Sequence, residues 1–128
     1  MRKKEILLGR HIELYAATQD GEELSLFEND LNELDKKDAD GITLDIKYMA
    51  DNIQILWNKT KFNWLDYGLY EFKIKHFRVF TYNESNNLEL GKTNKKKMVL
   101  LYVFKKKTQK TPTQEIRKCK KIIKELED

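Results

Sequence analysis

Two repeating patterns of apolar and polar residues divide the chain into predicted strands and helices. Alternation at every second position indicates strands at residues 12–17, 69–75 and 77–82. A nearly continuous apolar run, Met98–Phe104, indicates a further strand that is covered on both faces and is therefore central. A tight link at His76 joins the strands at 69–75 and 77–82 as a hairpin.

The strand at 69–75 has the clearest alternation of all. Its residues are Tyr70, Phe72 and Ile74 on the apolar side and Glu71, Lys73 and Lys75 on the polar side. An amphipathic strand covers a core with one side and turns its charges to the other. We therefore expect a charged face on this part of the sheet.

Apolar spacing of three and four residues predicts two amphipathic helices, at residues 24–34 and 42–56. The intervening segment, 36–41, breaks the pattern. Because both helices have an apolar stripe and the connection is short, we expect them to pack as an antiparallel hairpin.

A third helix is predicted to begin at Thr111, with this residue as the N-cap, Pro112 at the first helical position and Gln114 three residues after the cap. Polar connections are expected at 58–68 and 83–97. The element order is then β-α-α-β-β-β-α in a single domain. This order predicts an α+β fold: a small antiparallel (mixed) sheet with a two-helix N-terminal hairpin and a C-terminal helix.

Composition excludes several classes of protein. The chain has 128 residues, of which 40% are hydrophobic, and no apolar run approaches the ~20 residues of a membrane span. The apolar stretch near the N-terminus is too short for a signal peptide. The lone cysteine, Cys119, has no partner for an internal disulfide, and with only two histidines the usual zinc ligands are missing. We expect a soluble, cytoplasmic domain that uses no metal and no cofactor.

Charge is divided sharply along the chain. Residues 1–58 carry 7 Lys and Arg against 13 Asp and Glu, whereas residues 59–128 carry 18 against 8, which leaves a formal net charge of only +4. A basic half of this kind suggests an anionic partner, and a solvated surface is the alternative.

Many of the cations lie where the predicted strands would meet. If the last three strands pair as a meander, their polar side chains gather on one concave face, where Arg binds phosphate as a planar fork and Lys as a point charge. Nearby tyrosines could stack on unpaired bases. The charged residues are Glu71, Lys73, Lys75, Arg78, Lys105, Lys106, Lys107 and Lys110, and the tyrosines are Tyr67, Tyr70, Tyr82 and Tyr102. A solvated strand face remains the alternative interpretation of this group.

Three blocks of sequence carry a resemblance to a known family. They are G-L-Y-E-F-K at 68–73, F-R-V-F at 77–80, and the run 99–112, which ends in K-K-T-Q-K-T-P. Together they resemble the phage-derived, HigB-like branch of the RelE/HigB toxin superfamily, over about residues 12–126. The resemblance implies a RelE-like fold and a bacterial or phage-encoded type II toxin that cleaves mRNA, usually on the ribosome. It also implies inhibition by a cognate antitoxin, which we expect to be a helix-turn-helix protein similar to HigA.

Metal-independent RNA cleavage fits the residues present. The ribose 2′-OH must lose its proton and attack the adjacent phosphate, and cations stabilise the negative charge that develops. We expect Arg78 to hold the scissile phosphate, and Lys73 and Lys106 to stabilise this charge or to transfer a proton. Glu71 is either the base or a partner that holds a neighbouring cation, and the cations favour the second role because they lower its pKa. Further RNA contacts are expected from Lys75, Lys105, Lys107, Lys110, Tyr70 and Tyr102.

Several other residues invite a chemical interpretation that we consider weaker. His76 is expected to be an exposed turn residue rather than a general acid, and Cys119 a core residue rather than a nucleophile. We expect Thr108, Gln109 and Thr111 to hold the loop and cap the last helix. Two tryptophans are expected in the core or at an interface, namely Trp57 and Trp64.

Two other functions remain open. A ParE-like inhibitor of DNA gyrase would need no convergent cations, so the clustered charges favour a nuclease. A phage-encoded RNA-binding or interaction protein that has lost catalysis is the third possibility. It gains weight because Lys73 stands where the family has Arg, and because the 83–97 hairpin is long.

Overall fold

One mixed sheet of six strands forms the centre of the computed structural model, which describes residues 1–83, 91–107 and 110–127. The spatial order of the strands is β1-β2-β6-β5-β4-β3. Strands β2 and β6 pair in parallel, and every other neighbouring pair is antiparallel. The strands are β1 (Arg2–Leu8), β2 (Ile12–Thr18), β3 (Phe62–Asp66), β4 (Leu69–Ile74), β5 (Phe77–Asn83) and β6 (Lys96–Lys105). The predicted meander of the last three strands is confirmed.

The predicted element order is wrong at two places, because both edge strands of the sheet were missed. Strand β1 precedes the strand expected at 12–17, and β3 lies in the segment 58–68 that was expected to be a loop. An edge strand pairs on one side only and tolerates polar, exposed side chains, so its sequence need not alternate cleanly. The start of β1 is charged, and β3 is only five residues long.

The two N-terminal helices exist, with different bounds from those expected. Helix α1 (Leu26–Glu33) begins with an N-terminal capping box. The Ser25 hydroxyl accepts from the Glu28 N–H at 3.0 Å, and the Glu28 carboxylate accepts from the Ser25 N–H. Helix α2 (Lys36–Asp51) begins where a break was expected, because the Asp35 side chain caps it. The 3-10 helix η1 (Ile53–Trp57) then replaces the end of the expected helix.

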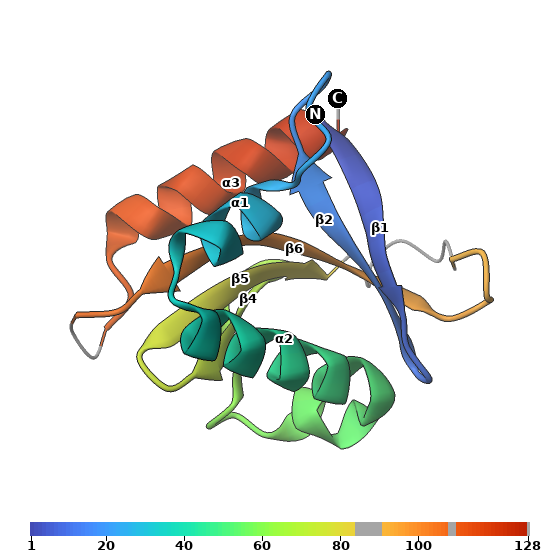
Figure 1. Cartoon of the computed structure of the whole chain (residues 1–128), viewed down its shortest axis with the longest axis horizontal. Coiled ribbons are helices and arrows are strands. Elements are labelled where there is room, and N and C mark those ends of the chain that lie inside the picture. Colours follow the sequence, from blue (N-terminus) through green and yellow to red (C-terminus); the bar gives the residue numbers. More distant parts are fainter. Residues whose placement is uncertain (84–90, 108–109, 128) are drawn as a thin grey trace.

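These two helices do not form the expected N-terminal hairpin. Helix α1 packs on β2 and β6, and α2 packs mainly on β1, β2 and β4. Figure 1 shows the sheet between α2 on one side and α3 (Thr113–Glu127) on the other. Each helix buries its apolar stripe against the sheet, so neither stripe is free for its neighbour. Among the described residues, no helix is long and apolar enough to cross a membrane.

Two hydrophobic clusters fill the two sides of the sheet. The cluster under α2 includes Leu14, Ile42, Met49, Phe72 and Leu100, all essentially inaccessible to solvent. The cluster under α3 is built from Ala17, Phe80, Leu101, Cys119 and Ile122. The side of the sheet that faces α3 is also the side that carries the predicted charged face of β4.

Candidate functional site

The β4–β5 hairpin brings the first two predicted site residues together. Lys73 of β4 and Arg78 of β5 lie directly opposite each other in the antiparallel register, so both side chains project from the same face. A two-residue link joins the strands, and Lys75 in that link has a φ of 53°. The predicted position of His76 in a tight, exposed link is confirmed.

A β-bulge in β6 selects which of the three consecutive lysines joins this face. Val79 pairs with Val103 and Thr81 with Leu100, so Phe80 alone opposes the two residues between them on β6. The additional residue reverses the alternation beyond that point. As a result Phe104, which pairs with Arg78, faces α3, and Lys106 follows it on the same side. Lys105 pairs with Phe77 and projects from the opposite face.

Lys73 and Lys106 border an open hollow of about 420 Å³ between β3, β4, the end of β6 and the start of α3, which we call the cationic hollow. Its charged and polar lining consists of Asn63, Glu71, Lys73, Lys106, Lys110 and Thr111. Three lysines, a carboxylate and two uncharged polar side chains therefore meet in one concavity. A concave surface of this charge attracts phosphate groups.

Glu71 lies on the floor of the cationic hollow, with only 2% of its surface exposed. The Thr111 hydroxyl donates to Glu71 Oε2 at 2.5 Å, and the Asn63 amide donates more weakly to Oε1 at 3.4 Å. A buried carboxylate that is held from both sides cannot move readily toward a substrate. The geometry thus agrees with a positioning role for Glu71 rather than that of a free base.

Thr111 was expected to cap the last helix, and that expectation is wrong. The Pro112 carbonyl accepts from the backbone N–H groups of Glu115 and Ile116, so the helix begins one residue later. The Thr111 hydroxyl is engaged by Glu71 instead. The T-P pair therefore connects the last helix to the floor of the cationic hollow.

The electrostatic environment of Lys106 links four charged groups of the site. Partial burial lowers its pKa, the Glu71 carboxylate raises it in part, and the charges of Arg78 and Lys73 lower it further. These influences place all four groups within electrostatic reach of one another. A lowered pKa makes the Lys106 ammonium a better proton donor than an isolated lysine.

Arg78 is half-buried and is held by the hairpin itself. Its Nη1 donates to the carbonyls of Phe77 at 2.8 Å and Lys75 at 3.1 Å. Its Nε is buried and has no hydrogen-bond partner within the described part of the chain. The two backbone carbonyls fix the orientation of the guanidinium, the planar group that proteins use to bind phosphate as a fork.

The other predicted RNA contacts are scattered. Lys75 and Lys107 are exposed, and Lys105 lies across the sheet from the cationic hollow. Tyr70 stacks on Phe62 on the side that faces α2, with ring centroids 4.7 Å apart, so it does not join the cations. Thr108 and Gln109 lie outside the described residues, as do residues 84–90 of the connection expected at 83–97.

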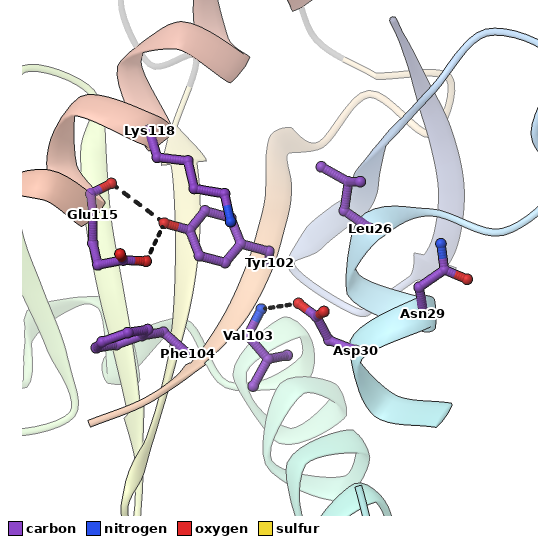
Figure 2. A pocket seen from close by; sticks show the side chains of 8 residues that line it. All are labelled: Leu26, Asn29, Asp30, Tyr102, Val103, Phe104, Glu115 and Lys118. Atoms are coloured by element: carbon purple, nitrogen blue, oxygen red, sulfur yellow. Dashed lines mark hydrogen bonds between the residues drawn. The ribbon is translucent and has the colours of Figure 1, made fainter. Parts of the chain in front are cut away.

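Tyr102 lies beneath α3, where it cannot act as an open stacking platform. Its side chain is 5% exposed, its hydroxyl donates to the Glu115 carboxylate at 2.9 Å, and the Lys118 ammonium lies 4.3 Å from the ring centre. Figure 2 shows these contacts. The bulge at 101–102 turns both residues toward α3, and the predicted base-stacking role of Tyr102 is not supported.

Cys119 is fully buried in the cluster under α3, as expected of a core residue, and burial raises the pKa of its thiol to about 12. Trp57 and Trp64 are 73% and 60% exposed, so neither is a core residue. Asn63 was not identified from the sequence, because the edge strand that carries it was taken for a loop. Within residues 1–83, 91–107 and 110–127, no group of three or more His, Cys, Asp or Glu side chains could hold a metal ion.

The fold and the cationic hollow define a small α+β protein with a basic concave face, and comparison with protein families identifies its kind. Residues 29–124 match the family described as phage derived protein Gp49-like (DUF891). The chain therefore belongs to this Gp49-like family, which is of the RelE/HigB-like toxin type. The narrower HigB-like branch stays a prediction. No curated protein matches the chain.

Proposed function

We propose that the chain is the toxin of a type II toxin–antitoxin system and that it acts as a metal-independent endoribonuclease on mRNA, in association with the ribosome. The family supports the toxin class. The observation that carries the nuclease is the gathering of Lys73, Arg78 and Lys106 on one face of the β4–β5–β6 meander, where Lys73 and Lys106 line an open hollow. A surface that only contacts another protein has no need for three converging cations.

The proposed reaction is a transesterification. The ribose 2′-oxygen loses its proton, attacks the adjacent phosphorus and displaces the 5′-oxygen, which takes a proton; the products are a 2′,3′-cyclic phosphate and a 5′-hydroxyl. Arg78 and Lys73 stabilise the negative charge on the phosphorane oxygens. Lys106 donates the proton to the leaving oxygen, in keeping with its lowered pKa. Water or another base, rather than the buried Glu71, accepts the first proton.

Glu71 acts as a positioning residue in this proposal. Its carboxylate is anchored by Thr111 and lies within electrostatic reach of Lys106. Lys110, at the mouth of the cationic hollow, would contact the flanking RNA backbone, and Lys107 would reach further RNA from outside it. A cognate helix-turn-helix antitoxin would inhibit the protein in the cytoplasm.

Controlled expression in bacteria tests the proposal. We expect growth arrest, with mRNA cut at discrete sites that primer extension detects, and we expect coexpression of the neighbouring small reading frame to restore growth. The Arg78→Ala variant should be harmless. Arrest with intact mRNA and impaired DNA supercoiling would favour a ParE-like gyrase inhibitor, and harmless expression of the unaltered chain would contradict both toxin functions.

A further inference from the structure

A second pocket, of about 220 Å³, lies between α1, β6 and the start of α3. It is lined by aromatic, acidic and amide side chains together with one ammonium group (Figure 2). The residues used below are Asp30, Phe104, Glu115 and Lys118. We call this the base pocket. None of the functions assigned above uses it.

The base pocket adjoins the proposed catalytic cations. Phe104 pairs directly with Arg78 across the β5–β6 ladder, and Lys106 follows Phe104 by two residues on the same face. Phe104 therefore lies beside the group that would hold the scissile phosphate, and its ring borders the base pocket. A nucleotide bound through its phosphate to Arg78 has its base within reach of this opening.

Two carboxylates give the base pocket acceptors on opposite sides. One oxygen of Asp30 accepts from the Val103 backbone N–H at 2.8 Å, and one oxygen of Glu115 accepts from the Tyr102 hydroxyl at 2.9 Å. Each carboxylate has further lone pairs for a ligand. Burial raises the pKa of Asp30, the Val103 N–H lowers it in part, and Glu33 raises it further, so additional donors would relieve a poorly solvated anion.

We propose that the base pocket binds a nucleobase next to the cleaved phosphate and selects bases that present donors on their Watson–Crick edge, guanine foremost. The proposal rests on the nuclease function above. Guanine has N1–H and N2–H₂ side by side, which match the oxygens of a carboxylate, and unpaired bases are commonly held between an aromatic ring and hydrogen bonds to that edge. Phe104 supplies the ring, and Asp30 supplies the acceptor.

The carboxylates do not repel the RNA from this pocket, because Lys118 offsets part of their charge. Its ammonium lies over the Tyr102 ring at the edge of the pocket. The phosphate would bind outside, on the cations of β4, β5 and β6. The arrangement separates an acceptor-rich site for the base from a donor-rich site for the backbone.

Mapping cleavage sites on one mRNA with three proteins tests the inference. Asp30→Asn keeps an oxygen for the Val103 N–H and removes a charged acceptor, whereas Glu22→Gln removes the same charge from an exposed residue a few positions before the same helix that does not line the pocket. We expect unaltered protein and Glu22→Gln to cut beside guanosine. Asp30→Asn should lose that preference by roughly tenfold or more. An unchanged preference in Asp30→Asn would overturn the inference and leave the nuclease intact.

A titration with mononucleotides tests binding to the base pocket independently of cleavage. Guanosine 3′-monophosphate should shift the Val103 amide resonance, inosine 3′-monophosphate should bind more weakly because it lacks the N2 amino group, and Asp30→Asn should abolish the difference. If the unaltered protein cuts no RNA, the proposed function fails, and this titration still tests the pocket. Equal binding of both nucleotides to the unaltered protein would contradict the inference. So would a result in which Asp30→Asn keeps the difference between the nucleotides and loses only the binding of a basic protein partner.

Discussion

Two buried glutamates at different places in the sheet show how a purely structural carboxylate differs from one that belongs to a candidate functional site. Glu13 on β2 is fully buried and accepts from the Tyr15 hydroxyl and the Thr93 N–H, each at 2.7 Å, and from the Thr93 hydroxyl. Burial raises its pKa, but these hydrogen bonds outweigh burial and bring the pKa to about 2. Gly91 approaches so closely that a Cβ there would overlap the Glu13 carboxylate.

Glu71 is just as deeply buried and also accepts from a threonine hydroxyl, yet it borders an open space. The difference lies in the surroundings. Glu13 is enclosed by its donors, whereas Glu71 forms the floor of a hollow that several cations enter. A buried carboxylate is therefore a poor indicator of a functional site by itself. A group of cations beside an open space that can hold a ligand is a better indicator.

The largest effect is expected from Arg78→Ala, which removes the arginine opposite Lys73. Loss of the phosphate contact should reduce the RNA cleavage rate by about 10²- to 10³-fold, because one preorganised donor to the developing charge is removed. Single-turnover cleavage of a defined mRNA measures the effect. Arg10→Ala, which removes an exposed arginine from the turn between β1 and β2, is the matched control and should cleave normally. Equal rates for the two variants would eliminate Arg78 as the phosphate contact.

Glu13→Gln should affect stability and not cleavage. Replacing the charged acceptor weakens buried hydrogen bonds from Tyr15 and Thr93, so we expect a loss of about 2–3 kcal/mol in the free energy of unfolding. Urea denaturation at pH 7 measures this loss, with the exposed Glu125→Gln as the control.

The pH dependence of that difference has a definite sign. The folded-state pKa of Glu13 is about 2, below the ordinary value of 4.5, so its contribution is complete above pH 4.5 and is lost as the pH falls toward 2. The stabilities of the unaltered protein and Glu13→Gln should therefore converge in acid. A difference that persists at the lowest pH would show that the charge is not the cause.

Lys106→Arg keeps the positive charge but removes a group that exchanges its proton readily. We expect the cleavage rate to fall about tenfold, or ~1.4 kcal/mol in activation free energy. The fall in cleavage rate should be larger for an RNA whose 5′-oxygen is a poorer leaving group. It should vanish when a 5′-thio leaving group, which needs no protonation, is substituted. An unchanged rate on the ordinary RNA would assign Lys106 to charge stabilisation alone.

Thr111→Val should give the smallest effect, because it removes one hydroxyl from Glu71. A cost of about 1 kcal/mol in stability is expected for the lost hydrogen bond, together with a modest fall in cleavage rate. Thermal unfolding and single-turnover kinetics measure the two. Thr113→Val, at an exposed position two residues on, should change neither. A loss of stability without any change in cleavage rate would show that Thr111 has a structural role only.

The meander and one face of the site could be predicted from the sequence. Strict alternation over 69–75 placed Lys73 on the charged face, and the tight link at His76 placed Arg78 beside it, as the register confirms. The edge strands β1 and β3 were missed because one-sided pairing leaves little hydrophobic pattern.

Lys106 was singled out from three consecutive lysines, but the pattern of apolar positions supplied no physical reason for that choice. The side of the sheet that Lys106 joins depends on the bulge opposite Phe80, and the run Met98–Phe104 is apolar on both faces, so nothing in its pattern marks the additional residue. Thr111 was misassigned for a similar reason: a Thr-Pro pair before a helix suits a cap, and only the fold shows that Glu71 lies within reach of its hydroxyl.

The chemical nature of the RNA ends tests the central claim most directly. Purified protein would be added to a translating extract and, separately, to ribosome-free RNA. Both mixtures would contain enough chelator to remove the free divalent ions but not those that the ribosomes retain, and the 3′ ends of the fragments would be analysed. The account predicts 2′,3′-cyclic phosphate ends from the unaltered protein and none from Arg78→Ala. Fragments that end in a 3′-hydroxyl, or RNA that stays intact in both mixtures, would contradict it.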